Sequence, residues 1–263
     1  MIEAIDFQLC LTSGQVFGWK KVGENWIGCD GTRNYCLASL SDIHYQDAGL
    51  LFGFHIILED GLKTILEADP KLATTTEKLK GLRLMQPRSF EQTLFTFLCT
   101  QNNHLPRIEK MVQSLLAFSQ TGFPPAALIA DIGEERLREL GFGYRAESIV
   151  KVARILAKDE KIEENLRSLS YPEARKALME LPGIGPKLAD CVALYGLHHL
   201  EAVPVDTHLW QAVVQRYRPE WILASISAKR YWEIGEILRD KFGEWAGYAQ
   251  LLLYYGHMQK ILL

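Results

Sequence analysis

The hydrophobic pattern of the chain changes near residue 87. Before it, aromatic and β-branched residues alternate or cluster in three short runs, at 14–22, 25–31 and 33–40. Glycine and asparagine interrupt these runs at 22–25 and 29–34, where tight turns are expected. The pattern predicts an antiparallel sheet within the first 60 or so residues.

From Pro87 onward, apolar residues recur at the three- and four-residue spacing of helices. Ser89 precedes the first such segment and is expected to be its N-cap. Pro106, Pro172 and Pro186 stand where later helices should begin, the position at which a missing N–H costs least. Helices are expected at 89–101, 106–118, 134–140, 144–158, 172–181, 186–197, 206–217, 228–242 and 248–258. This predicts an α+β protein, with a small N-terminal antiparallel sheet domain at 1–86 and a helical region at 87–263.

The composition is that of an ordinary globular protein, with 48% apolar and 23% charged residues. The formal net charge is −3, so the chain is not a general binder of polyanions, and any contact with nucleic acid must come from a local patch. The N-terminus has no basic segment before an apolar core, and the longest apolar run, 50–58, is too short to cross a bilayer. We expect a cytoplasmic protein without a membrane segment.

The cysteines are scattered, and no two of them form a CxxC pair. This spacing does not favour a zinc or iron–sulfur site, and an odd number without pattern fits a reducing compartment. The five are Cys10, Cys29, Cys36, Cys99 and Cys191.

The segment 180–196, ELPGIGPKLADCVALYG, carries the first candidate chemistry. Gly183 and Gly185 are expected to form a tight turn between two helices, because glycine adopts conformations that other residues resist. Lys187 follows at the start of the second helix, where a positive charge opposes the helix dipole. A helix start also directs backbone N–H groups outward, and such groups bind phosphate. An ordinary turn between helices would explain the glycines equally well.

A carboxylate follows in the segment 201–213, EAVPVDTHLWQAV. Asp206 directly precedes a helical pattern and is expected to be its N-cap. Capping alone could account for it. A carboxylate beside a lysine that the helix dipole favours as a neutral amine would, however, form a nucleophile and its stabilising partner.

Lys187 and Asp206, in LPGIGPKLADC and VPVDTHLW, resemble the signature of the helix–hairpin–helix DNA glycosylases. Within that superfamily, the chain is most similar to the 8-oxoguanine DNA glycosylases. Four more segments resemble motifs of that family in the same order, so the resemblance covers nearly the whole chain. They are TSGQVFGW at 12–19, FTFLCTQNNHLPRI at 95–108, LGFGYRAESI at 140–149 and YAQLLLYY at 248–255.

The resemblance implies a bifunctional DNA glycosylase and AP lyase whose helical region has two packed subdomains with the active site in the cleft between them. Lys187 matches the nucleophile that attacks the sugar C1′ and forms a Schiff base. Asp206 matches the carboxylate that stabilises the oxocarbenium-like sugar as the base departs. The strand would then be nicked by β-elimination at the abasic site.

Four residues match positions that recognise the flipped base. Gly14 matches the glycine whose carbonyl accepts a hydrogen bond from N7–H, which 8-oxoguanine has and guanine lacks. Cys191, one helical turn after Lys187, matches the residue that pairs with the lysine against the base. Gln250 matches the reader of the Watson–Crick edge, and Tyr254 the aromatic ring that stacks on the base. Without the resemblance, Cys191 and Tyr254 would be taken for core residues.

Other positions match contacts with the DNA around the lesion. Asn102, Arg107 and Arg145 match residues that read the cytosine left behind, and Tyr144 matches a wedge beside the gap. Phosphates would be held by Gly183, Gly185 and His208. The resemblance requires no cofactor, although a monovalent cation can bind at the hairpin carbonyls of Met179, Leu181 and Ile184.

The sequence also departs from the family pattern. Gly18 stands where the family has arginine, and His104 replaces the third asparagine of the 95–108 motif. Tyr195 occupies a pocket position that is often methionine, and Tyr254 one that is often phenylalanine. Discrimination among lesions and strictness for opposite cytosine could differ accordingly.

The expected partner is double-stranded DNA containing 8-oxoguanine paired with cytosine, bound by a monomer that is nucleoid-associated if its source is a prokaryote. We expect a basic face that includes Arg107, Arg145 and Lys187. Two alternatives stay open. One is a glycosylase of the same superfamily that acts on alkylated or other oxidised bases, and the other is a DNA-binding module without catalysis.

Overall fold

The computed structural model describes residues 5–262 and contains the expected antiparallel sheet. Its three strands run in sequence order, with Trp26 opposite Leu37 in the second pair. Gly23 and Gly31 turn the chain between them at positive φ, 60° and 61°. The strands are β1 (Lys20–Val22), β2 (Asn25–Asp30) and β3 (Arg33–Leu37).

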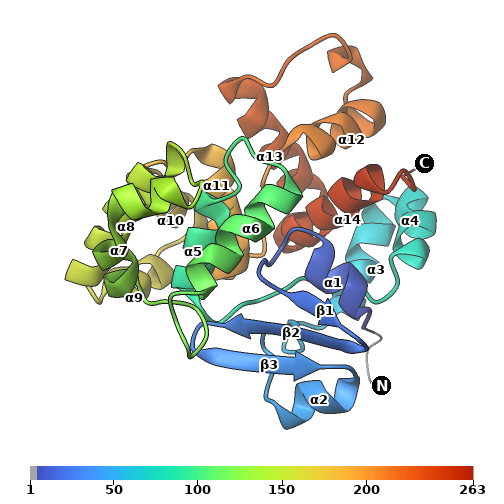
Figure 1. Cartoon of the computed structure of the whole chain (residues 1–263). Coiled ribbons are helices and arrows are strands. Elements are labelled where there is room, and N and C mark those ends of the chain that lie inside the picture. Colours follow the sequence, from blue (N-terminus) through green and yellow to red (C-terminus); the bar gives the residue numbers. More distant parts are fainter. Residues whose placement is uncertain (1–4, 263) are drawn as a thin grey trace.

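The N-terminal 86 residues also contain helices that the pattern did not predict. They are α1 (Phe7–Thr12), α2 (Leu40–Tyr45), α3 (Leu58–Ala68), the 3₁₀ turn η1 (Pro70–Leu72) and α4 (Ala73–Lys78). Helix α3 contacts α13 and helix α4 contacts α14, so both pack against the C-terminal helices although they precede the expected boundary at 86 (Figure 1).

The rest of the chain is helical, as expected, although the sequence pattern did not predict the helix at Ile162–Ser168. Ser89 caps its first helix by accepting a hydrogen bond from the Gln92 N–H at 3.1 Å, and the three prolines lie in first turns. The elements are α5 (Phe90–Leu98), α6 (Leu105–Leu116), α7 (Ala126–Glu139), α8 (Arg145–Lys158), α9 (Ile162–Ser168), α10 (Tyr171–Met179), α11 (Pro186–Cys191), the π-helical turn η2 (Val192–Gly196), α12 (Thr207–Tyr217), η3 (Pro219–Trp221), α13 (Ala228–Phe242), η4 (Gly243–Trp245) and α14 (Ala246–Met258). No helix within residues 5–262 is long and apolar enough to cross a membrane.

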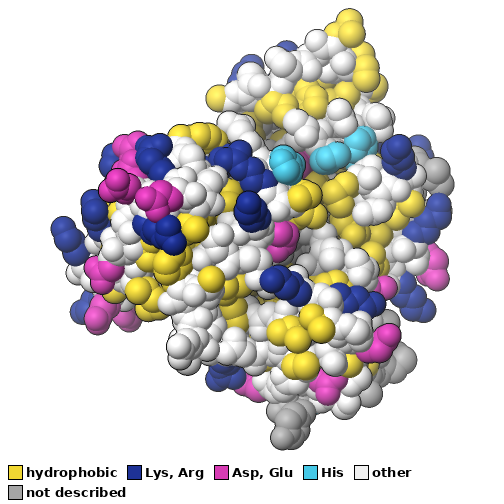
Figure 2. Space-filling model, viewed as in Figure 1, with side chains coloured by type: hydrophobic (Ala, Val, Ile, Leu, Met, Phe, Trp, Pro, Cys, Tyr) yellow, Lys and Arg dark blue, Asp and Glu magenta, His cyan; other side chains and the backbone are white. Residues whose placement is uncertain are grey.

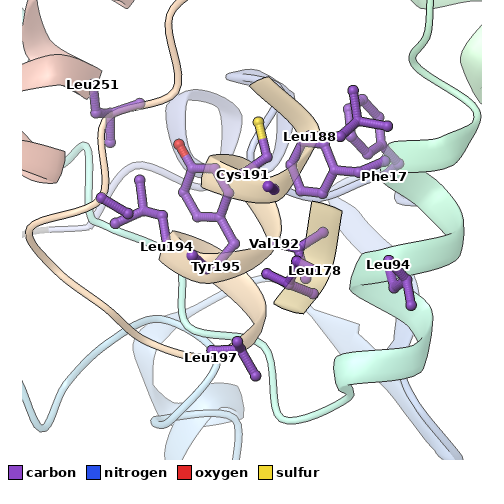
Figure 3. Close-up of a cluster of buried hydrophobic side chains, with 14 of the residues drawn as sticks. Phe17, Leu94, Leu178, Leu188, Cys191, Val192, Leu194, Tyr195, Leu197 and Leu251 are labelled. Atoms are coloured by element: carbon purple, nitrogen blue, oxygen red, sulfur yellow. The ribbon is translucent and has the colours of Figure 1, made fainter. Parts of the chain in front are cut away.

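These helices form two groups. Helices α5 to α11 lie on one side of the molecule and α12 to α14 on the other, with the sheet below both (Figure 1). The segment formed by α11 and η2 contacts α5 and α10 of the first group. Its apolar side chains join those of α5, α10 and α14 in one large core, which includes Leu94, Leu178 and Leu251 (Figure 3). The back of the Lys187 helix is therefore fixed by packing.

The sheet is joined to α5 by buried polar groups. The Asp30 carboxylate accepts hydrogen bonds from the backbone N–H groups of Arg88 and Ser89, at 2.8 and 2.9 Å. The Gln92 side chain accepts from Gly31 N–H at 2.7 Å and donates to the Cys29 carbonyl at 2.9 Å. The turn after β2 thus holds the start of α5, because each of these buried groups has its partner on the other element.

His198 joins the end of η2 to the segment before α5. It has φ +68°, and its Nε2 lies 2.9 Å from the Pro87 carbonyl oxygen. Burial lowers the pKa of His198 to about 4, and the Pro87 hydrogen bond opposes that shift only in part. The folded protein therefore favours the neutral imidazole, whereas the unfolded chain protonates it near its ordinary value of 6.5.

The first prediction concerns acid stability. Because the folded-state pKa of His198 lies below the unfolded value, its contribution is complete above pH 6.5 and is lost as the pH falls towards 4. Through His198, the wild-type protein should lose up to about 3 kcal/mol of unfolding free energy over this interval. The variant His198→Asn should not show this loss, and asparagine tolerates the positive φ. Urea unfolding at pH 7 and pH 4.5 measures the unfolding free energy of both proteins. An unchanged difference between the two pH values would contradict the assignment.

Candidate active site

A cleft of about 810 Å³ lies where the two groups of helices meet the loop after α1. It is lined from the 12–14 loop, the α5–α6 loop, the hairpin and α11, the start of α12, and α14. Histidine side chains lie on this face, below the protruding α12–α13 segment, with lysine and arginine side chains nearby (Figure 2). The expected site residues that line the cleft are Gly14, Asn102, Tyr144, Gly183, Gly185, Lys187, Asp206, His208 and Tyr254.

Lys187 enters the cleft from the first turn of α11, whose N-cap is Gly185. Its Nζ lies 5.5 Å from the centroid of the Phe97 ring. An aromatic face attracts the ammonium and also limits its contact with water. The Lys187 amine is thus placed in a pocket with an apolar wall, at the positive end of a helix.

Cys191 lies one turn behind Lys187 and is buried. Burial raises the pKa of the Cys191 thiol to about 11, while Lys187 opposes this increase through its charge and a side-chain hydrogen bond. The group is therefore a neutral thiol at physiological pH. It can pack against a ligand beside Lys187 but is not itself a nucleophile.

Asp206 is the N-cap of α12, as the sequence predicts. Its Oδ1 accepts a hydrogen bond from the Leu209 N–H at 2.8 Å. This bond fixes the carboxylate at the positive end of α12, and the residue lines the same cleft as Lys187. Two helix N-termini thus bring a primary amine and a carboxylate to one cavity.

The two hairpin glycines differ from each other. Gly183 has φ +81°, and an added Cβ would lie 2.7 Å from the Cβ of Ser148. Gly185 has φ −93°, and no atom lies within 4 Å of such a Cβ. The expectation that both positions of the turn require glycine is wrong for Gly185, whose backbone conformation any residue can adopt. The open space above Gly185 leaves room for a ligand to approach the chain.

Of the base-recognition candidates, Gly14 and Tyr254 line the cleft, whereas Cys191 and Gln250 are buried and are not among its lining residues. Gly14 has φ +83°, and an added Cβ would meet the Tyr254 hydroxyl at 3.4 Å. Tyr254 is partly buried, and burial is the main cause that raises its pKa. One turn earlier, Gln250 is only 4% exposed, and its Oε1 has no hydrogen-bond partner among the described residues. A buried amide oxygen without a partner costs roughly 1–3 kcal/mol unless a ligand supplies one.

The opposite-strand candidates form a compact loop cluster. Asn102 has φ +40°. Arg145 donates from Nε to the Gln101 carbonyl at 2.8 Å and from Nη2 to the Asn102 carbonyl at 2.9 Å, and its guanidinium lies 4.6 Å from the centroid of the Tyr144 ring. Tyr144 is 52% exposed, as a wedge would be. Arg145 is only 2% exposed, so the expectation that it belongs to an exposed basic face is wrong.

Arg107 lies outside the cleft lining. It is exposed, and its Nη2 donates to the Gly141 carbonyl at 3.0 Å. The hairpin residues Met179, Leu181 and Ile184 also lie outside the lining, and the Leu181 carbonyl accepts a hydrogen bond from Ile184 N–H at 3.1 Å. Carbonyl oxygens of this kind are suitable ligands for a monovalent cation. Within residues 5–262, no three histidine, cysteine, aspartate or glutamate side chains group as metal ligands.

Two departures from the family pattern have structural reasons. Gly18 has φ +88°, and an added Cβ would lie 3.0 Å from Leu116, so an arginine would be strained there. Tyr195 is buried and stacks on Phe97, with ring centroids 5.7 Å apart. It is not among the cleft-lining residues, so it supports the cleft from behind instead of lining it.

The sequence pattern did not single out His257. Its Nδ1 lies 3.4 Å from that of His208, at the cleft edge. His257 follows Tyr254 by three residues on α14, so helical spacing from Gln250 and Tyr254 was the signal that could have found it. Burial lowers the pKa of His257, and His208 adds to that effect.

Known proteins share this fold. The family model described as HhH-GPD superfamily base excision DNA repair protein matches residues 95–235. The N-glycosylase/DNA lyase OGG1 of Arabidopsis thaliana is 32% identical, over 97% of this chain and 78% of that protein. The structure of MBOgg1 in complex with a low affinity DNA ligand has a TM-score of 0.86 and 25% identity, over 98% of this chain and 94% of that one.

A further solved structure has the same fold. It is the Clostridium acetobutylicum 8-oxoguanine glycosylase/lyase in complex with double-stranded DNA containing cytosine opposite 8-oxoG, with a TM-score of 0.85 and 23% identity over 98% of this chain and 93% of that one. The chain therefore belongs to the HhH-GPD superfamily of base excision DNA repair proteins. Within it, the chain falls among the enzymes named N-glycosylase/DNA lyase, which confirms the family expected from its motifs.

The second prediction uses the two hairpin glycines as a matched pair. Gly183→Ala combines a left-handed backbone with a clash against Ser148, and we expect it to lower the unfolding free energy by about 2–4 kcal/mol. Gly185→Ala should change it by less than about 0.5 kcal/mol. Urea unfolding of both variants measures this, and equal effects would contradict the difference between the two positions.

Proposed function

We propose that the protein excises 8-oxoguanine opposite cytosine from double-stranded DNA and then cleaves the abasic strand. The observation that carries the proposal is that Lys187 and Asp206, each at a helix N-terminus, line one cleft together with Gly14 and Tyr254. The cleft is large enough for a single flipped nucleotide, and its remaining lining comes from loops on either side.

Base excision begins with the neutral amine of Lys187. Its Nζ attacks C1′ of the flipped nucleotide, and the N-glycosidic bond breaks as the base leaves with a proton. Positive charge develops on the sugar, and the Asp206 carboxylate, held by Leu209 N–H, stabilises it. The product is a Schiff base between Lys187 and C1′ of the opened sugar.

Strand cleavage follows from the same adduct. The iminium group acidifies the C2′ hydrogens, and loss of one of them breaks the C3′–O bond by β-elimination. The downstream strand leaves with its 5′-phosphate, and water then releases Lys187 by hydrolysis of the imine. The monovalent cation expected at the hairpin has no part in these steps.

Selectivity for the oxidised base would come from polar groups around the pocket. The carbonyl of Gly14 accepts from N7–H of 8-oxoguanine, whereas guanine offers a second acceptor there. The unpaired Oε1 of Gln250 supports this assignment, because it needs a donor such as the Watson–Crick edge of a purine. Tyr254 stacks on the base, and the Cys191 thiol packs beside Lys187.

The surrounding DNA would be held on both strands. Asn102, Arg107 and Arg145 read the cytosine and Tyr144 fills the gap, while backbone N–H groups near Gly185 and the His208 imidazole bind phosphates. For Arg145 this requires its Nη1 group, because Nε and Nη2 already donate to carbonyls. The protein acts as a monomer and, in a prokaryote, in the cytoplasm on the nucleoid.

The third prediction is covalent trapping. With borohydride, the wild-type protein should form an adduct with an 8-oxoguanine:cytosine duplex, and Lys187→Gln should form none. We expect its excision rate to fall by more than about a hundredfold, because the nucleophile is absent. Lys176→Gln removes an exposed lysine of α10 and is the matched control, with unchanged trapping.

Trapping on duplexes with each of the four opposite bases tests the proposed partner, and cytosine should give the fastest reaction. Absence of an adduct with the wild type, or an adduct that survives Lys187→Gln, would overturn the proposed mechanism.

The fourth prediction separates stability from recognition. Gln250→Leu removes a buried, unpaired acceptor, so the unfolding free energy should stay within about 1 kcal/mol of wild type or rise. Excision of 8-oxoguanine should slow by about 10- to 100-fold, because the base edge loses its partner. Gln86→Leu is the control, since Gln86 is likewise buried with an unpaired Oε1 and outside the cleft lining, but it lies before α5 and not on α14 one turn from Tyr254. Equal excision rates for the two variants would remove Gln250 from the recognition site.

A further inference from the structure

A buried carboxylate lies directly behind the nucleophile helix. Asp190 precedes Cys191 on α11, and only 1% of its surface is exposed. Its Oδ1 accepts hydrogen bonds from the Tyr171 hydroxyl and from Arg175 Nε, both at 2.8 Å and both from α10. Its Oδ2 accepts a hydrogen bond from the Tyr231 hydroxyl of α13. No step of the proposed reaction uses this group.

Burial of this carboxylate is compensated by its partners. Burial raises the pKa of Asp190, while the Arg175 charge and the two tyrosine hydroxyls oppose that increase. Three donors on two oxygens favour the ionised form, and Arg175 neutralises its charge. The arrangement therefore fixes Asp190 in one position relative to α10 and α13.

One of these partners continues to the catalytic loop. The Tyr231 oxygen donates to Asp190 and also accepts a hydrogen bond from the backbone N–H of Val205, at 3.3 Å. Val205 is buried and directly precedes Asp206. The chain of contacts thus runs from α11, three residues after Lys187, through Tyr231 to the residue before Asp206.

Asp206 is held on its other side as well. Its carboxylate accepts from Leu209 N–H at 2.8 Å, which fixes the side chain to α12. The Leu209 bond orients the carboxylate on its own helix, but it does not set the distance between α12 and α11. The Tyr231 bridge connects the backbone N–H of Val205, next to Asp206, to the Lys187 helix.

We propose that Tyr231, through its hydrogen bonds to Asp190 and to Val205 N–H, is a positioning residue that sets the Asp206 carboxylate relative to the Lys187 amine. The inference rests on the proposed function, because it assigns a chemical role to both of those residues. Tyr231 touches neither substrate nor reacting atoms. Its loss would slow excision and leave DNA binding unchanged, since displacement of a catalytic group by about 1 Å can cost two orders of magnitude in rate.

Tyr171 provides a matched control. Tyr171→Phe and Tyr231→Phe each remove one hydroxyl that donates to Asp190, and each keeps its ring. Only Tyr231 also accepts from Val205 N–H. A purely structural role in satisfying the Asp190 carboxylate predicts similar effects for the two variants, whereas positioning of Asp206 predicts a selective effect at Tyr231.

The experiment measures single-turnover excision on an 8-oxoguanine:cytosine duplex and the dissociation constant for a duplex whose 2′-fluoro lesion resists excision. Both variants are assayed at a temperature where circular dichroism shows them folded. We expect Tyr231→Phe to slow excision by about tenfold or more, and by at least threefold more than Tyr171→Phe, with dissociation constants within about twofold of wild type.

The positioning role is overturned if Tyr231→Phe slows excision by less than about tenfold, or by less than three times the slowing of Tyr171→Phe. It is also overturned if weaker DNA binding accounts for the slowing. A wild-type protein that does not excise the base, or forms no adduct with borohydride, instead overturns the proposed function. The two failures are therefore distinguishable, because the first requires an active wild type.

Discussion

The buried Asp190 carboxylate is the point at which the helices around the cleft are joined. It receives two donors from α10 and one from α13, and it belongs to α11. A carboxylate that is 1% exposed is stable only when its lone pairs and charge are satisfied, so α10, α11 and α13 can pack in one arrangement. Arg239 extends the cluster through a hydrogen bond to Tyr171 at 3.4 Å.

That arrangement places two helix N-termini at one cavity. The first turn of α11 presents Lys187, and the cap of α12 presents Asp206. Both termini carry partial positive charge, and the Asp206 carboxylate accepts a hydrogen bond from one of the unpaired N–H groups of its helix. The same two termini also leave backbone N–H groups for anions, so the features that prepare the chemistry also suit a phosphate backbone.

Much of this could be predicted from the sequence because local signals agree with the fold. Ser89, Pro186 and Asp206 begin helices where their side chains satisfy or avoid unpaired N–H groups, and all three positions are confirmed. Helices α1 to α4 were not predicted. Helices α1, α2 and α4 have only six residues each, and α3 has the non-capping Ile57 at its N-cap. Short helices depend on tertiary packing, which α13 supplies for α3 and α14 for α4.

The pairings between distant segments could not be predicted. The burial of Arg145 against the Gln101 and Asn102 carbonyls joins residues 44 and 43 positions apart, and the meeting of His208 with His257 spans 49. Such contacts depend on how helices cross, which periodicity does not determine. The backbone conformation of Gly185 could not be predicted either, because a glycine in the sequence does not reveal whether its φ is positive.

Gln101 links the hairpin to the loop that carries Tyr144 and Arg145. Its Nε2 donates to the Gly183 carbonyl in the hairpin at 2.5 Å, and its own carbonyl accepts from Arg145 and from the Tyr144 hydroxyl. Through its side chain and its backbone carbonyl, Gln101 thus connects the hairpin to the start of α8. Whatever free energy this connection transmits must act equally in both directions, so a ligand bound at the hairpin would tune the affinity of the Tyr144 loop for its own ligand, and the reverse.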